Sequence, residues 1–194
     1  MNSFCPPPPS PANARYKENS FTVMTDEEWE QLQIPTTVAD LVFKGYIGYY
    51  STIFNLSPFN SLRHLTMIRN NFKNVSSLRI ENMPNLDIIQ IGKNSFSLLH
   101  FGDDITSTRD CHICHCPKLK SIDVGNMAFY DYTVLELHDL PSLEDLSMKR
   151  NCFYFGRQFV LQGKHVLKTT RIILFRPSIV KKAFIRRIYI LSRS

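Results

Sequence analysis

The chain has 194 residues, 43% of them hydrophobic, and a formal net charge of +6 at pH 7. This composition allows a sizeable core, while no apolar run approaches the roughly 18 residues of a membrane-spanning helix. The first residues lack the apolar region of a secretion signal, and the five cysteines make an odd total. Both observations favour a cytoplasmic location with reduced thiols.

Two short segments precede the main body of the chain. Residues 1–20 carry Pro6 to Pro9 and predict a Pro-rich disordered tail, with an SH3 or WW ligand as the alternative. Residues 21–37 contain Thr25 followed three residues later by Glu28, the form of a helix capping box. We expect a short helix there whose Trp29 packs on the first coil as an N-terminal cap. The alternative is an acidic docking helix.

Residues 38–162 repeat one phrase five times: an apolar residue at offsets 0, 3 and 5, then usually Asn at 8 and Phe at 10. The copies start at Val38, Leu62, Leu86, Leu119 and Leu143. Successive starts are 24 residues apart, except for 33 between Leu86 and Leu119. A fixed period of this length indicates a solenoid, with the nine extra residues in a loop within about 97–110 that leaves the register intact.

Alternating apolar residues predict a short strand in each copy, near 40–44, 64–68, 88–92, 121–125 and 145–149. A second alternating phrase, in phase with the first, predicts further strands near 54–56, 78–80, 111–113, 135–137 and 159–161. Phe72, Phe96, Phe129 and Phe153 should stack as an aromatic spine. The Asn residues should bond the backbone at a buried turn, although Met127 replaces one of them.

The phrase LxxLxLxxNxL at 62–72, 86–96 and 143–153, with Phe at its last position, resembles the leucine-rich repeat superfamily, and Ile91-Gly92 to Phe96 is similar to its irregular BspA-like branch. The resemblance implies a β-rich α/β fold, a right-handed solenoid of about five 24-residue coils with parallel strands. It also implies that the principal sheet forms the concave binding face.

Cys111-His112-Ile113-Cys114-His115-Cys116 is the one segment with the composition of a zinc site. The repeat frame instead turns Cys111 and Cys116 into the core and His112 and Cys114 away from it. We therefore expect no metal and no cofactor.

The C-terminal part is strongly basic. From Leu146 to Ser194 there are twelve Lys and Arg residues and no acidic one. Residues 163–194 are interpreted as a basic C-terminal cap or tail, in which Val180, Phe184, Ile188 and Leu191 recur at helical spacing. Such a helix would cap the last coil or bind anionic lipid or nucleic acid.

The chain contains no recognisable catalytic motif, so we expect no enzymatic activity and assign no catalytic residue. The favoured function is a repeat scaffold that binds another protein through its principal sheet. The alternative is binding of an anionic surface, either membrane lipid or nucleic acid, through the basic C-terminal segment. For any single residue, plain solvated surface is an equally good interpretation. The candidate partner-binding residues are His64, Thr66, Ile68, Arg69, Gln90, Lys93, Asp123, Ser147, Lys149 and Arg150.

Overall fold

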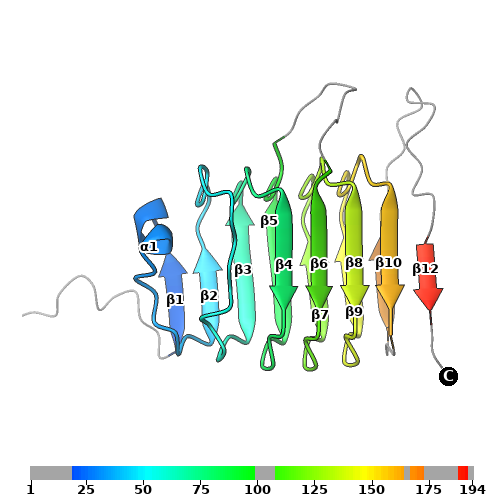
Figure 1. Ribbon diagram of the computed structural model, residues 1–194, viewed down its shortest axis with the longest axis horizontal. Helices are drawn as coiled ribbons and strands as arrows, with labels where there is room; N and C mark the ends of the chain where they lie inside the picture. Colours follow the sequence, from blue (N-terminus) through cyan, green and yellow to red (C-terminus); the bar gives the residue numbers. More distant parts are fainter. Residues whose placement is uncertain (1–18, 99–107, 164–166, 173–187, 192–194) are drawn as a thin grey trace, which may run out of the picture.

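The computed structural model describes residues 19–98, 108–163, 167–172 and 188–191 as a β-solenoid of about six turns (Figure 1). Two parallel sheets form its two sides. The seven-stranded sheet has the order β1 (Ser20–Val23), β2 (Asp40–Phe43), β3 (His64–Arg69), β5 (Ile88–Lys93), β7 (Ser121–Val124), β9 (Asp145–Met148) and β11 (Thr169–Ile172). The five-stranded sheet has the order β12 (Ile188–Leu191), β10 (Gln158–Gln162), β8 (Val134–His138), β6 (Asp110–Cys114) and β4 (Ser77–Glu81).

The predicted repeat register is confirmed. Leu65 pairs with Ile89, and Ile89 pairs with Ile122 across the longer interval. The nine extra residues therefore leave neighbouring coils in step, because the chain resumes the same phase after them. Residues 99–107 of that interval lie outside the described residues.

One predicted strand, at 54–56, is wrong. Asn55 Oδ1 accepts a hydrogen bond from Ser57 N at 2.9 Å, and Phe59 N donates to Leu56 O at 2.9 Å. These local turns hold the backbone in place of a ladder with β4. Phe54, Leu56 and Phe59 are nevertheless buried, so the inward pattern holds without the strand.

The helix predicted through Ile188 and Leu191 in the C-terminal segment is also wrong. Ile188–Leu191 is strand β12, paired with β10. The segment Ile-Tyr-Ile-Leu is rich in residues that favour strands, and it satisfies the backbone groups along one edge of β10. Val180 and Phe184 lie outside the described residues, as do the tail at 1–18 and the segment 173–187 that carries much of the basic charge.

The core between the sheets is built from the inward residues of each strand, and an aromatic spine runs through it as predicted. Phe96 and Phe129 stack with centroids 5.0 Å apart and planes at 1°. Phe72 lies 5.7 Å from Phe96, and Phe153 lies 5.0 Å from Phe129. Each ring thus fills the space between two coils, so the core forms only when coils stack on one another.

Helix α1 (Asp26–Glu30) closes the N-terminal end of the core beside β1, at the blue end of the molecule in Figure 1. Its predicted capping box is present, since Glu28 N donates to Thr25 Oγ1 and the Glu28 carboxylate accepts from Thr25 N. Trp29 is buried, stacked on Phe54 at 5.2 Å and edge-on to Phe43 at 5.1 Å.

The turns after β2, β3, β5, β7 and β9 each place the residues at offsets 8 and 10 in the left-handed region. Asn94 has φ 58° and Phe96 has φ 55°. Asn tolerates this conformation better than most residues. The prediction that the repeat Asn side chains bond the backbone is wrong. Two of them bond each other instead, since Asn94 Nδ2 donates to Asn70 Oδ1 at 3.1 Å. The neighbouring Asn71 bonds the backbone instead, accepting from Ile47 N.

Met127 occupies the same position with φ 58°, where its side chain has no such tolerance. We expect Met127→Asn to raise the free energy of unfolding by about 1 kcal/mol and the Tm by about 2–4 °C. The reverse change at a matched position, Asn151→Met, should lower stability by a similar amount, since Asn151 has φ 60°. Thermal denaturation of both variants checks this, and a Met127→Asn protein no more stable than the wild type would contradict it.

Candidate functional site

The outward side chains of the seven-stranded sheet stand in rows across its strands, because paired residues of neighbouring coils lie about 4.8 Å apart. His64 on β3 has its Nδ1 2.5 Å from Asp40 Oδ1 on β2. In the next row Thr66 Oγ1 donates to Gln90 Oε1 at 3.3 Å. These two predicted residues of β3 are therefore already engaged by their neighbours on the same face.

Toward the C-terminal coils the same face carries a second group of predicted residues. Asp123 on β7 pairs in register with Ser147 on β9. Lys149, which directly follows β9, has its Nζ 3.2 Å from Asp123 Oδ2. The backbone N–H of Arg150 donates to Asn126 Oδ1 at 3.1 Å. The structure thus brings Asp123, Ser147 and Lys149 together on β7 and β9, with Arg150 next to Lys149 in the turn that follows β9.

At the carboxyl ends of β3 and β5 lie exposed residues that belong to neither group. Ile68 is 47% exposed, which is unusual for a large aliphatic side chain. Arg69 and Lys93, register partners at the ends of β3 and β5, are both exposed. Neither forms an ion pair with a carboxylate in the described part of the chain, although the Arg69 guanidinium lies 5.9 Å from the ring centre of Tyr46. An apolar side chain flanked by unneutralised cations is a surface suited to binding.

Gly92 and Gly125, which the alternation places on the outward face, do not open a notch there. A Cβ atom at Gly92 would lie 1.9 Å from the carbonyl oxygen of Ile68, and one at Gly125 would lie 2.8 Å from Lys93 N. Both glycines allow a close approach of one coil to the backbone of the one before it. Their role is in packing and not in recognition.

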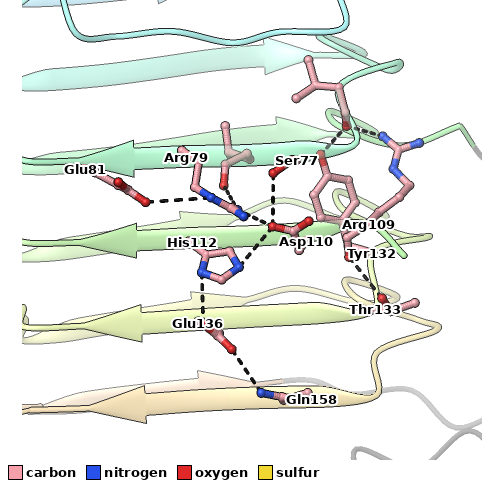
Figure 2. Close-up of polar contacts among 12 residues, drawn as sticks. Ser77, Arg79, Glu81, Arg109, Asp110, His112, Tyr132, Thr133, Glu136 and Gln158 are labelled. Carbon is pink, nitrogen blue, oxygen red and sulfur yellow. Dashed lines mark hydrogen bonds and ion pairs between the residues drawn. The ribbon is translucent and has the colours of Figure 1, made fainter. Parts of the chain in front are cut away.

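The face of the five-stranded sheet carries a polar network that sequence reasoning missed (Figure 2). Asp110 on β6 is its centre. Its Oδ2 accepts from the Ser77 hydroxyl at 3.2 Å and from the Arg79 guanidinium, and it lies 3.1 Å from His112 Nε2. Three neighbours thus converge on one carboxylate from two adjacent strands.

The network continues from His112 across β8 to β10. His112 Nδ1 lies 3.0 Å from Glu136 Oε2, and Gln158 donates to Glu136 Oε1 at 3.1 Å. His138 Nε2 lies 3.4 Å from the same Glu136 carboxylate. Each ring nitrogen of His112 thus faces a carboxylate, Asp110 on one side and Glu136 on the other. The one available signal was that Arg79, His112 and Glu136 share one offset in the second phrase.

A buried ion pair between Arg109 and Asp131 links the two described ends of the long interval between coils. Arg109 Nη1 donates to Asp131 Oδ2 at 2.8 Å, and Leu98 N donates to Asp131 Oδ1 at 3.3 Å. Arg109 Nη2 also donates to Val75 O, as does the Tyr132 hydroxyl, and both Arg109 and Asp131 are only 2% exposed. Burial raises the pKa of that hydroxyl. These contacts hold Leu98 and Arg109, the two described ends of the interval, close together, and the ion pair is shielded from solvent.

The cysteines lie as the repeat frame predicts: Cys111 and Cys116 are buried, and Cys114 is half-buried on the outward side of β6. His112 also points outward, so these side chains cannot converge on one ion. Over the residues that the structure describes, no three His, Cys, Asp or Glu side chains are placed to hold a metal.

Thiol labelling should separate these cysteines. Partial burial, and next the nearby Glu81 carboxylate, raise the pKa of Cys114 to about 11. Labelling of Cys114 in a Cys5→Ser protein should therefore speed up about tenfold per pH unit from pH 8 toward 11, because the thiolate is the reactive form. Glu81→Gln should accelerate it at pH 8. Burial raises the pKa of Cys111, which should stay unlabelled while the protein is folded. Mass spectrometry checks this, and equal labelling of Cys111 and Cys114 would contradict it.

No family model, no curated protein and no solved structure matches this chain. The resemblance to leucine-rich repeats therefore stays an interpretation of the repeat phrase, while the solenoid itself rests on the structure. No helix in the described ranges is both long and apolar enough to cross a bilayer.

Proposed function

We propose that the protein is a non-enzymatic repeat scaffold that binds another protein through the outward face of its seven-stranded sheet. The observation that carries this proposal is the patch formed by Ile68, Arg69 and Lys93. An exposed aliphatic side chain lies there beside two cations that have no carboxylate partner among the described residues. Arg and apolar side chains together are typical of the centres of protein interfaces.

A comparison of the two sheet faces supports the choice of this one. On the five-stranded sheet Arg79, Asp110, His112, Glu136 and Gln158 bind one another in an unbroken chain of contacts (Figure 2). A partner would have to compete with those contacts. The patch on the seven-stranded sheet offers donors that a partner carboxylate would neutralise at no such cost.

A pair of matched variants tests the proposal. Ile68→Asp places a charge at the centre of the patch, whereas Val160→Asp places one on the outward side of β10 in the other sheet. Proteins captured from a native extract by the full-length chain should be lost with Ile68→Asp and retained with Val160→Asp. Ile68 is exposed, so Ile68→Asp should keep the wild-type Tm within a few degrees. Val160 is half-buried, so Val160→Asp should lower the Tm but leave the protein folded during capture, which thermal denaturation checks. Captured proteins that bind both variants equally would contradict the proposal.

The same capture experiment distinguishes protein binding from the alternative function. Binding of nucleic acid or anionic lipid through the basic C-terminal segment would be insensitive to both substitutions. For a nucleic acid it would also fall by about 10³–10⁵ in affinity between 50 and 200 mM salt, given 6–10 phosphate contacts. Capture that weakens with salt in this way and is unchanged by Ile68→Asp would favour the alternative function.

A further inference from the structure

The loop that follows β2 carries an exposed apolar cluster, which we term the tyrosine loop and define as Tyr46, Tyr49, Tyr50 and Ile53. These are four of the eight large apolar side chains that are exposed in the described part of the chain. Tyr50 is 79% exposed and Ile53 is 73% exposed. Tyr49 and Tyr50 hold one another edge to face, with centroids 4.9 Å apart. These two rings therefore pack on each other at the surface without being buried.

Helix α1 borders the tyrosine loop on its N-terminal side with acidic residues. Gly48 N donates to Asp26 Oδ1 at 2.6 Å, and the Ser51 hydroxyl donates to Glu30 Oε1 at 3.4 Å. These contacts hold the helix against the loop. Glu27 and Glu30 are both exposed, and the described helix contains no basic residue in its last turn. The surface on this side of the loop is negative.

The next coils border the tyrosine loop on its other side with basic residues. Tyr46 N donates to Arg69 O, and the Arg69 guanidinium lies 5.9 Å from the Tyr46 ring centre. Lys73 Nζ lies 5.7 Å from the Tyr49 ring centre. Lys93 follows as the register partner of Arg69. Along the solenoid axis the surface therefore runs from negative, through an aromatic centre, to positive.

We propose that the tyrosine loop is a self-association site that binds a second copy of this chain about a two-fold axis. In such an isologous contact the same patch meets itself in reverse order. The two tyrosine loops then pack at the centre, and the α1 carboxylates of each copy face Arg69, Lys73 and Lys93 of the other. Tyr is among the residues that contribute most at interface centres. The site shares Arg69 and Lys93 with the proposed partner patch, whereas the tyrosine loop lies outside that patch and Ile68 lies outside this site.

The charge order favours a second copy over other occupants. A nucleic acid or an acidic protein would meet the basic side favourably but would be repelled by Glu27 and Glu30. A basic partner would meet the opposite conflict at Arg69 and Lys93. A second copy related by a two-fold axis satisfies both sides at once, because opposite charges then face each other across the interface.

Two charge-reversed proteins test the proposal with full-length chains in sedimentation velocity. Glu27→Lys with Glu30→Lys cancels the net negative charge of α1, because Asp26 and Glu28 remain, and Arg69→Glu with Lys93→Glu makes both sides acidic. Neither variant should dimerise, because the first has no acidic side to meet its basic side and the second repels itself. An equimolar mixture of the two should form a one-to-one dimer, because each basic side meets an acidic side. The wild type should dimerise with a Kd between about 1 and 100 μM.

Two uncharged substitutions test whether the tyrosine loop forms the dimer contact. Tyr50→Ser should weaken wild-type dimerisation about tenfold or more. Ile68→Thr, at an exposed apolar residue outside the tyrosine loop, should leave it unchanged. A wild-type chain that remains monomeric at about 100 μM, a mixture that does not associate, or a dimer that is indifferent to Tyr50→Ser would each overturn the proposal. None of these results depends on whether the patch around Ile68 binds a partner.

Discussion

Phe129→Ala is expected to lower the free energy of unfolding by about 4 kcal/mol. Phe129 is 2% exposed and lies in the middle of the aromatic spine, stacked on both Phe96 and Phe153 at 5.0 Å. It also meets Tyr132 edge to face at 5.0 Å. Truncation removes a ring from between two coils, and the ladders on either side keep those coils from closing the gap. Urea denaturation measures the loss.

An exposed aromatic residue provides the control. Tyr50→Ala, measured at low protein concentration, should change stability by no more than about 0.5 kcal/mol. If Phe129→Ala cost as little as Tyr50→Ala, the stacked rings would not contribute to the core in solution. A Phe129→Ala protein that unfolds in two steps would instead show that the spine couples the N-terminal coils to the C-terminal ones, since neighbour contacts alone carry cooperativity in a solenoid.

Asp131→Asn is expected to cost about 3–5 kcal/mol, the second large effect. The change keeps the shape of the side chain but removes the charge that neutralises Arg109, whose guanidinium is buried and 4.8 Å from the Tyr132 ring centre. An uncompensated buried cation is far more costly than an absent surface pair. Thermal and urea denaturation of the full-length protein measure the effect.

The comparison for this prediction is an exposed ion pair. Lys168 Nζ lies 2.9 Å from Glu144 Oε2, with the Lys168 side chain 63% exposed. Lys168→Ala should therefore cost less than about 1 kcal/mol, because water already solvates both groups. A loss for Asp131→Asn as small as that for Lys168→Ala would mean that water reaches Arg109 and replaces its partner.

The repeat phrase predicted most of the solenoid, and its failures have local causes. Inward apolar residues such as Leu65 and Ile89 recur at a fixed period, so both their burial and their pairing follow from spacing alone. The residues around Asn55 fit the same apolar pattern, but an Asx turn at Ser57 decides the backbone there. Ile188 fits a helical and a strand pattern equally, and only the available edge of β10 distinguishes them.

The candidate site was less predictable, because it depends on which side chains meet across coils. Spacing placed Thr66, Gln90 and Asp123 on one face correctly, but it could not show that Thr66 bonds Gln90 or that Asp123 meets Lys149. The pair of Arg109 and Asp131 has no counterpart in the other coils that the structure describes, so no repeat pattern could reveal it. Pairing of this kind needs the register of neighbouring coils and the directions of the side chains.

The left-handed residues at two fixed places in the turns after β2, β3, β5, β7 and β9 limit how the length of this chain can change. One residue added between Leu65 and Phe72 would carry Phe72 out of the stack and would bring residues of unsuitable backbone preference to the left-handed positions. A whole added turn would instead lengthen the array by one rung and leave every neighbour in register. Insertions and deletions in this protein should therefore be tolerated as complete turns, or after Ser97, where the array already accommodates nine residues beyond the common period.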